Sequence, residues 1–239
     1  MKQTNEAAWL KFEELDNEET WNLSEFKYCI GGFDAADSVD LNAAKAVCMR
    51  PNDDRIYVKS MYWIPQDVID QVRATRRERD NAPYELWVNQ GWLRTCEGNK
   101  CDKRIFLEWY KELREEGLYT LYIGYDPWHI SDELLREFRA EFGKNSMIPV
   151  RQGFKTESEP LKEIKADFQQ KRIVYDNNPI DKWCLVNSCI KTDPNGNQML
   201  VKNADRRNRN DGTSALLDAY VVLMNNKDKY INLNDEVTQ

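Results

Sequence analysis

The segment Tyr28–Leu41, YCIGGFDAADSVDL, constrains the fold of this chain more than any other stretch. An apolar run ends in Gly31 and Gly32, and Asp34 follows almost at once. A carboxylate at the end of a buried strand is costly unless it is paired or binds a cation. The segment therefore predicts a core strand that delivers one acidic side chain to a site, followed by a turn and a second strand.

The rest of the chain predicts a mixed α/β fold. Three strands with short connections, at 28–33, 41–49 and 55–63, are typical of an antiparallel meander. We also expect helices at 5–16, 64–80, 103–116, 132–142, 159–170, 181–190 and 212–224. Further strands are expected at 118–125 and 147–150, with an extended segment at 86–94 and a hairpin at 191–202. This order predicts three antiparallel strands followed by alternating strands and helices, with helices on both faces of the sheet.

The composition narrows the class of protein. The chain has 239 residues and a net charge of −7, which is not typical of a strongly basic nucleic-acid binder. A carboxylate-rich metal site would lower the net charge while basic patches elsewhere bind phosphate. No apolar run is long enough to span a membrane, and the start has no signal-peptide core.

The six cysteines are interpreted as reduced, buried thiols of a cytosolic protein. Cys96 and Cys101 form one C-x4-C pair, and Cys184 and Cys189 form another. A zinc site built from these four residues is the minor alternative.

A second strand ends in the same way as the first. Asp126 follows Gly124-Tyr125, as Asp34 follows Gly32-Phe33, and both carboxylates could converge at one edge of the sheet. Asp211 is a third candidate, at the start of the last helix. Each has a purely structural alternative, as a turn residue, a turn initiator before proline or a helix N-cap.

Three carboxylates on separate elements would suit hard divalent ions, which prefer oxygen ligands. Two Mg²⁺ or Mn²⁺ ions can together activate water and stabilise the leaving oxygen in phosphodiester cleavage. Asp34 is then the predicted bridging ligand. The chain has one histidine, His129, and neither a nucleophile-elbow serine motif nor a P-loop, so other chemistries are poorly provided for.

Four segments in order, GGFDAADSVDLNAA, IGYDPW, QGF and RNDGTSALLDAYVVL, resemble the nuclease domain of the large terminase subunit of tailed bacteriophages. The resemblance implies an RNase H-like fold and metal-dependent cutting of double-stranded DNA during genome packaging. It maps the family's three acidic residues onto Asp34, Asp126 and Asp211. Asp40 matches a further aspartate of the first motif, and Asp218 falls on the same helix face as Asp211 and is a candidate outer carboxylate.

DNA contacts are expected from local basic residues, although a solvated loop is the alternative. Lys202, Arg206, Arg207 and Arg209 flank Asp211, and Arg151 and Lys155 around Gln152-Gly153 are weaker candidates. No segment has the sequence pattern of a DNA-recognition helix, so we expect little base specificity.

The resemblance also suggests a domain organisation. We predict an N-terminal helix and linker at 1–25 that follow an absent ATPase domain, a nuclease domain at 26–226 and a polar, frayed tail at 227–239. Such a chain would cut DNA without translocating it. The family implies an ATPase domain, a small terminase subunit and a portal as partners, in the host cell cytoplasm and away from membranes.

Three alternatives remain open. The first is another RNase H-like nuclease, such as a resolvase, transposase or exonuclease. The second is an actin-like phosphotransferase, which would need a glycine-rich phosphate loop after its first strand and a second copy later. The third is a non-catalytic interaction module in which Asp34 and Asp211 are a turn residue and a helix cap.

Overall fold

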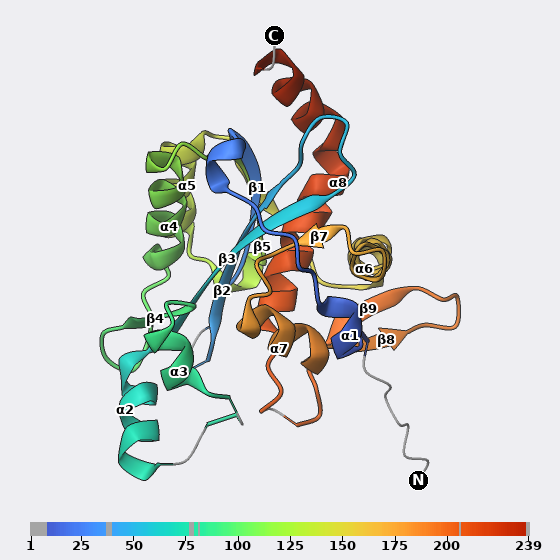
Figure 1. Cartoon of the computed structure of the whole chain (residues 1–239). Helices are drawn as coiled ribbons and strands as arrows, with labels where there is room; N and C mark the ends of the chain where they lie inside the picture. The colour runs from blue at the N-terminus through green and yellow to red at the C-terminus, as the bar shows by residue number, and fades with distance from the viewer. Residues whose placement is uncertain (1–8, 37–39, 77–78, 81, 206, 238–239) are drawn as a thin grey trace.

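The chain folds around a mixed β-sheet (Figure 1). The computed structural model describes residues 9–36, 40–76, 79–80, 82–205 and 207–237. The main sheet is formed by β1 (Tyr28–Asp34), β2 (Asn42–Cys48), β3 (Ile56–Pro65), β4 (Leu93–Cys96), β5 (Tyr119–Tyr125), β6 (Met147–Pro149) and β7 (Ile173–Val174), in the order β4-β3-β2-β1-β5-β6 with β7 also beside β3. A separate hairpin consists of β8 (Cys189–Thr192) and β9 (Gln198–Val201).

The pairing of the strands brings the two strand-end aspartates to one edge. β1, β2 and β3 form the predicted antiparallel meander. β5 runs parallel to β1, with Phe33 opposite Tyr125. The next residue of each segment is an aspartate, Asp34 or Asp126, so both carboxylates leave the sheet at the same level.

Helices cover both faces of the sheet, as predicted. The structure contains α1 (Phe12–Leu15), η1 (Leu23–Glu25), α2 (Gln66–Thr75), α3 (Tyr84–Asn89), α4 (Arg104–Glu115), η2 (Pro127–His129), α5 (Asp132–Phe142), α6 (Phe154–Gln169), α7 (Pro179–Asn187) and α8 (Asp211–Val237). α4 and α5 lie on one face, where Phe33 stacks on Phe106 at 4.5 Å and Phe138 at 5.6 Å between ring centroids. α8 and α6 cover the other (Figure 1).

Two glycines let α8 lie directly on the backbone of the sheet. A Cβ atom at Gly32 would come within 2.4 Å of the carbonyl oxygen of Ala215, and one at Gly124 within 2.4 Å of that of Asp218. No side chain fits into either space. The missing side chains at Gly32 and Gly124 therefore let the backbone of α8 approach β1 and β5 closely.

The predicted end of the last helix near residue 224 is wrong. α8 continues to Val237 although its last turns are polar. Tyr230 holds them, since its ring is fully buried and its hydroxyl donates to the carbonyl oxygen of Tyr28 at 2.8 Å and accepts from the backbone N–H of Met49 at 2.9 Å. A polar segment can stay helical when one residue per few turns is anchored in the core.

The segment between β3 and β4 also differs from its prediction. Residues 84–89 are helical instead of extended, because Tyr84 and Trp87, three residues apart, both pack against Trp183 of α7. The predicted helix at 64–80 is shorter and occupies 66–75, and those at 159–170 and 181–190 lie at 154–169 and 179–187. For the first helix, residues 5–8 lie outside the described residues, and α1 covers 12–15.

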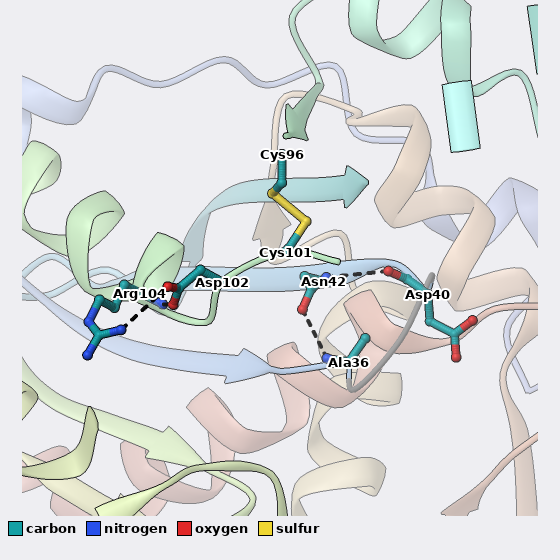
Figure 2. The surroundings of a disulfide bond; sticks show 7 residues. All are labelled: Ala36, Asp40, Asn42, Cys96, Cys101, Asp102 and Arg104. Atoms are coloured by element: carbon teal, nitrogen blue, oxygen red, sulfur yellow. Dashed lines mark hydrogen bonds and ion pairs between the residues drawn. A yellow bond between two sulfur atoms is a disulfide. The ribbon is translucent and has the colours of Figure 1, made fainter. Parts of the chain in front are cut away.

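The interpretation of all six cysteines as reduced is wrong for one pair. Cys96, at the end of β4, forms a disulfide with Cys101 (Figure 2). The thiols of Cys29, Cys48 and Cys184 are buried, and Cys189 is partly buried. Figure 2 also shows Asn42, which is fully buried: its side chain accepts a hydrogen bond from the N–H of Ala36 at 3.0 Å and donates to the carbonyl oxygen of Asp40 at 3.3 Å.

A buried ion pair supports the start of α8. Lys45 of β2 and Asp181 of α7 pair in the core, with side chains only 1% and 6% exposed. Lys45 also donates to the hydroxyl of Tyr62 at 2.7 Å, and that hydroxyl in turn donates to Asp181. The Tyr62 hydroxyl lies 2.1 Å from where a Cβ of Gly212 would be, so the network contacts the helix one residue after Asp211.

We expect Lys45→Ala to destabilise the fold by about 3–5 kcal/mol, because it leaves the Asp181 carboxylate unpaired in the core. Urea denaturation measures the change. Arg94→Ala, which breaks the half-exposed pair with Glu112, is the control and should cost less than about 1 kcal/mol. A loss for Lys45→Ala no larger than that of the control would contradict the role given to the buried pair.

Candidate metal and active site

The three predicted carboxylates meet in one cavity of about 520 Å³. Asp34 ends β1, Asp126 follows β5 and Asp211 is the first residue of α8. Asp218 lines the same cavity because it lies two turns further along the α8 face that packs on the sheet. The convergence follows from the parallel register of β1 and β5 and from the glycines beneath α8.

Hydrogen bonds fix the orientation of Asp126. Its Oδ1 accepts from the backbone N–H of Trp128 at 3.0 Å, which caps the short helix η2. Its Oδ2 accepts from Nε2 of Gln152 at 3.1 Å, and Gln152 also lines the cavity. Gln152 belongs to the QGF segment singled out in the sequence, so two of the recognised segments are in direct contact.

The cavity brings buried carboxyl groups together, which raises the pKa of Asp34, Asp211 and Asp218. Burial raises the pKa of the Asp34 carboxyl, and the charge of Asp126 adds to the shift while His129 and Lys202 oppose it. Burial and the charge of Asp34 raise the pKa of Asp211, and Arg209 opposes the rise. The pKa of Asp218 is also raised, by burial first and then by Asp34 and Asp126.

The donor set fits a hard divalent cation. The Oδ2 atom of Asp211 is buried and has no hydrogen-bond partner, which is unfavourable for a carboxylate oxygen unless a cation lies against it. Within the described ranges, no three His, Cys, Asp or Glu side chains already cluster as a metal site. The unpaired oxygen and the mutual repulsion of the carboxylates are therefore the features that favour cation binding.

Asp40 lines the cavity but is paired with Arg209. The Asp40 Oδ1 atom lies 2.8 Å from Nη1 of Arg209, whose Nε atom is 3.2 Å from Oδ2 of Asp80. Arg209 is only 16% exposed. It lies between the two carboxylates at the edge of the site and contributes positive charge toward Asp211.

The other basic candidates differ in their placement. Lys202 lines the cavity and lowers the pKa of Asp34 through its charge. Arg207 is exposed and paired with Asp205 at 2.7 Å. Arg206 lies outside the described residues, and Arg151 and Lys155 are exposed on either side of Gln152-Gly153.

Sequence reasoning missed Glu157 and gave His129 no role. Glu157 of α6 is 2% exposed and lines the cavity. Its carboxylate accepts from the N–H groups of Gly153 at 2.9 Å and Leu200 at 2.7 Å, which joins α6 to the β8–β9 hairpin. No local pattern distinguishes it from a surface glutamate. His129 lines the cavity, and its position three residues after Asp126 was the available signal.

Comparison with known proteins identifies the family. The model of the terminase large subunit endonuclease domain matches residues 1–226. The chain belongs to this terminase nuclease family. The structural likeness described below confirms the predicted RNase H-like α/β fold.

Two similar proteins and one solved structure define how far the similarity extends. Protein YmfN of Escherichia coli strain K12 is 28% identical over 227 residues, 90% of this chain and 47% of that protein. The terminase large subunit of Enterobacteria phage HK97 is 27% identical over 172 residues, 72% of this chain and 32% of that protein. The crystal structure of the HK97 large terminase matches with a TM-score of 0.70 and 20% identity, covering 90% of this chain and 43% of that chain.

The chain thus spans less than half the length of these relatives. Among the helices in the described ranges, none is both long and apolar enough to cross a membrane.

Proposed function

We propose that this chain is a divalent-metal-dependent endonuclease domain that cleaves double-stranded, concatemeric phage DNA during genome packaging. The observation that carries the proposal is the shared cavity of Asp34, Asp126, Asp211 and Asp218, in which negative charge is concentrated and one buried oxygen is unpaired. Membership of the terminase nuclease family supports the same activity.

Asp34, Asp126 and Asp211 would hold two Mg²⁺ or Mn²⁺ ions, with Asp34 between the others and Asp218 and Asp40 as outer carboxylates. When bound, such ions supply a nucleophile at neutral pH and stabilise charge on the reacting oxygens. The chain's own residues keep the site in shape: Gln152 orients Asp126, and Arg209 holds Asp40 at the rim. Glu157 fixes the hairpin beside the cavity.

The DNA backbone would be held by cations around this cavity. Lys202 would contact a phosphate next to the carboxylates, and Arg209 would add positive charge on one side. Arg206 and Arg207 are proposed as further DNA contacts. Arg151 and Lys155 would contact the backbone on the side of Gln152. Contacts of this kind position DNA without reading its sequence.

The proposed partners come from the resemblance to large terminase subunits. In a full-length subunit, an ATPase domain would precede this domain at residues 26–226, and residues 1–25 would connect the two. A small terminase subunit and a portal would act with it, in the cytoplasm of the host cell. The count of two metal ions belongs to the same proposal.

The direct test is cleavage of supercoiled plasmid DNA by the purified chain. With Mn²⁺ or Mg²⁺ we expect the plasmid to be nicked first and then linearised. Once EDTA removes the metal we expect no cleavage, because the metal ions supply the activated water. Cleavage that continues in EDTA would exclude metal-dependent hydrolysis. Complete absence of cleavage with every divalent ion would favour the non-catalytic alternative.

We expect Lys202→Ala to weaken DNA binding and to make its salt dependence shallower, because one phosphate contact fewer releases about one counterion fewer. Fluorescence anisotropy over a range of salt concentrations measures both quantities. Lys162→Ala, on the exposed side of α6 where it pairs with Glu159, is the control. A slope equal to that of the wild type would leave Lys202 without a phosphate contact.

A further inference from the structure

Trp128 is exposed to solvent, unlike the other tryptophans of the chain. Seven of the eight tryptophans are buried or half-buried, whereas the Trp128 side chain is 84% exposed. A single exposed apolar residue is common on protein surfaces and proves nothing by itself. Trp128 differs from such a residue in two respects: the turn that carries it is held by several hydrogen bonds, and that turn lies beside the cavity of the carboxylates.

The indole is carried by a turn that is held at several points. Pro127 fixes the backbone before it, and the N–H of Trp128 donates to the Asp126 side chain at 3.0 Å. The N–H of His129 donates to the carbonyl oxygen of Asp126 at 3.3 Å, and Lys103 Nζ donates to that of His129 at 2.6 Å. A side chain presented by a rigid turn loses less conformational entropy on binding than one on a free loop.

The turn forms part of the rim of the catalytic cavity. Asp126 and His129, which precede and follow Trp128, both line it. A DNA strand with one phosphate among Asp34, Asp126 and Lys202 carries its neighbouring nucleotides across the rim of the cavity. Where the strand crosses beside this turn, the exposed indole is the aromatic surface that the turn offers to a sugar or base.

We propose, on the basis of the nuclease function proposed above, that the Trp128 indole packs against the sugar and base of a nucleotide next to the phosphate in the cavity. Every base offers an aromatic face, so this contact tolerates any sequence. In an intact duplex an inserted aromatic side chain must first separate two stacked base pairs. The contact is therefore stronger on nicked or frayed DNA than on intact duplex.

The test compares DNA binding of Trp128→Ala, Trp128→Phe and Tyr119→Ala, each combined with Asp34→Asn so that the DNA is not cut. Tyr119, 46% exposed, lies at the opposite end of β5 and is the matched aromatic control. We expect Trp128→Ala to bind roughly five- to 150-fold more weakly, the value of one base–aromatic stack. Trp128→Phe should retain most of the affinity, and Tyr119→Ala all of it.

The salt dependence separates this contact from a phosphate contact. Trp128→Ala removes no charge, so the slope of log affinity against log salt should equal that of the parent protein. The loss should also be larger on a nicked duplex than on an intact one. Binding of Trp128→Ala within about twofold of its parent on both DNAs would overturn the proposal. The proposed nuclease function itself fails if the Asp34→Asn parent does not bind DNA and the wild-type protein does not cut it.

Discussion

Asp34→Asn is expected to reduce DNA cleavage at least about a hundredfold, the loss that follows removal of one group that stabilises transition-state charge. The substitution keeps the shape of the side chain and removes its charge from the centre of the cavity. Asp126→Asn should have a similar effect because the two residues occupy matching ends of β1 and β5. Initial rates of plasmid nicking in Mn²⁺ measure the loss.

Stability distinguishes this loss from unfolding. Burial raises the pKa of the Asp34 carboxyl, and the charge of Asp126 adds to this rise, so the charged form of Asp34 is destabilised in the folded protein. Above that pKa the charged group costs stability that Asn does not cost. In EDTA, Asp34→Asn should therefore melt at the same or a higher temperature than the wild type.

Asp70→Asn on the exposed face of α2 is the matched control and should cut DNA at the wild-type rate. An Asp34→Asn variant that melts well below the wild type, or one that cuts DNA normally, would contradict the assignment.

Gly32→Ala is expected to cost at least about 3 kcal/mol of stability, the upper end for overpacking, because the added methyl group meets backbone atoms that cannot rotate away. Its Cβ would lie 2.4 Å from the carbonyl oxygen of Ala215 and the backbone nitrogen of Ala219. Relief requires α8 to move away from β1, which carries Asp211 and Asp218 with it. A displacement of about 1 Å can lower catalysis on the order of a hundredfold.

Gly117→Ala is the control for Gly32→Ala. Gly117 has a φ of +97° and no atom within 4 Å of its Cβ position, so alanine there adds backbone strain without displacing α8. We expect a loss of about 1–2 kcal/mol and normal cleavage at a temperature where the variant is folded. Thermal denaturation and plasmid nicking measure both variants. Wild-type stability and cleavage in Gly32→Ala would show that α8 does not rest on β1.

The sequence predicted the parts of the fold that depend on local patterns. β1 and β5 could be recognised in the sequence because each is an apolar run that ends at a glycine-x-aspartate motif. α5 could be recognised because Ser131 caps its N-terminus. The end of α8 could not be recognised in the sequence. It depends on a hydrogen bond from the hydroxyl of Tyr230 to a residue about 200 positions earlier in the chain. Short elements such as α3 depend on aromatic packing against α7.

The same distinction holds for the candidate site. Asp34, Asp126 and Asp211 stood out because they follow strands or open a helix, and the structure places all three in one cavity. Glu157 and the Lys45–Asp181 pair could not be recognised, because their partners lie on distant segments and a buried carboxylate has the same sequence signature as an exposed one. The roles of the individual aspartates and basic residues in metal and DNA binding stay predictions.

The most direct measurement is a crystal structure of the chain with Mn²⁺, with the ions located by their anomalous scattering. The account predicts two peaks about 4 Å apart in the cavity, with oxygen atoms of Asp34, Asp126 and Asp211 as ligands. Asp34→Asn crystals grown in the same way should lose at least one of them. A cavity without anomalous density in the wild type, with Mn²⁺ bound elsewhere, would contradict the central claim.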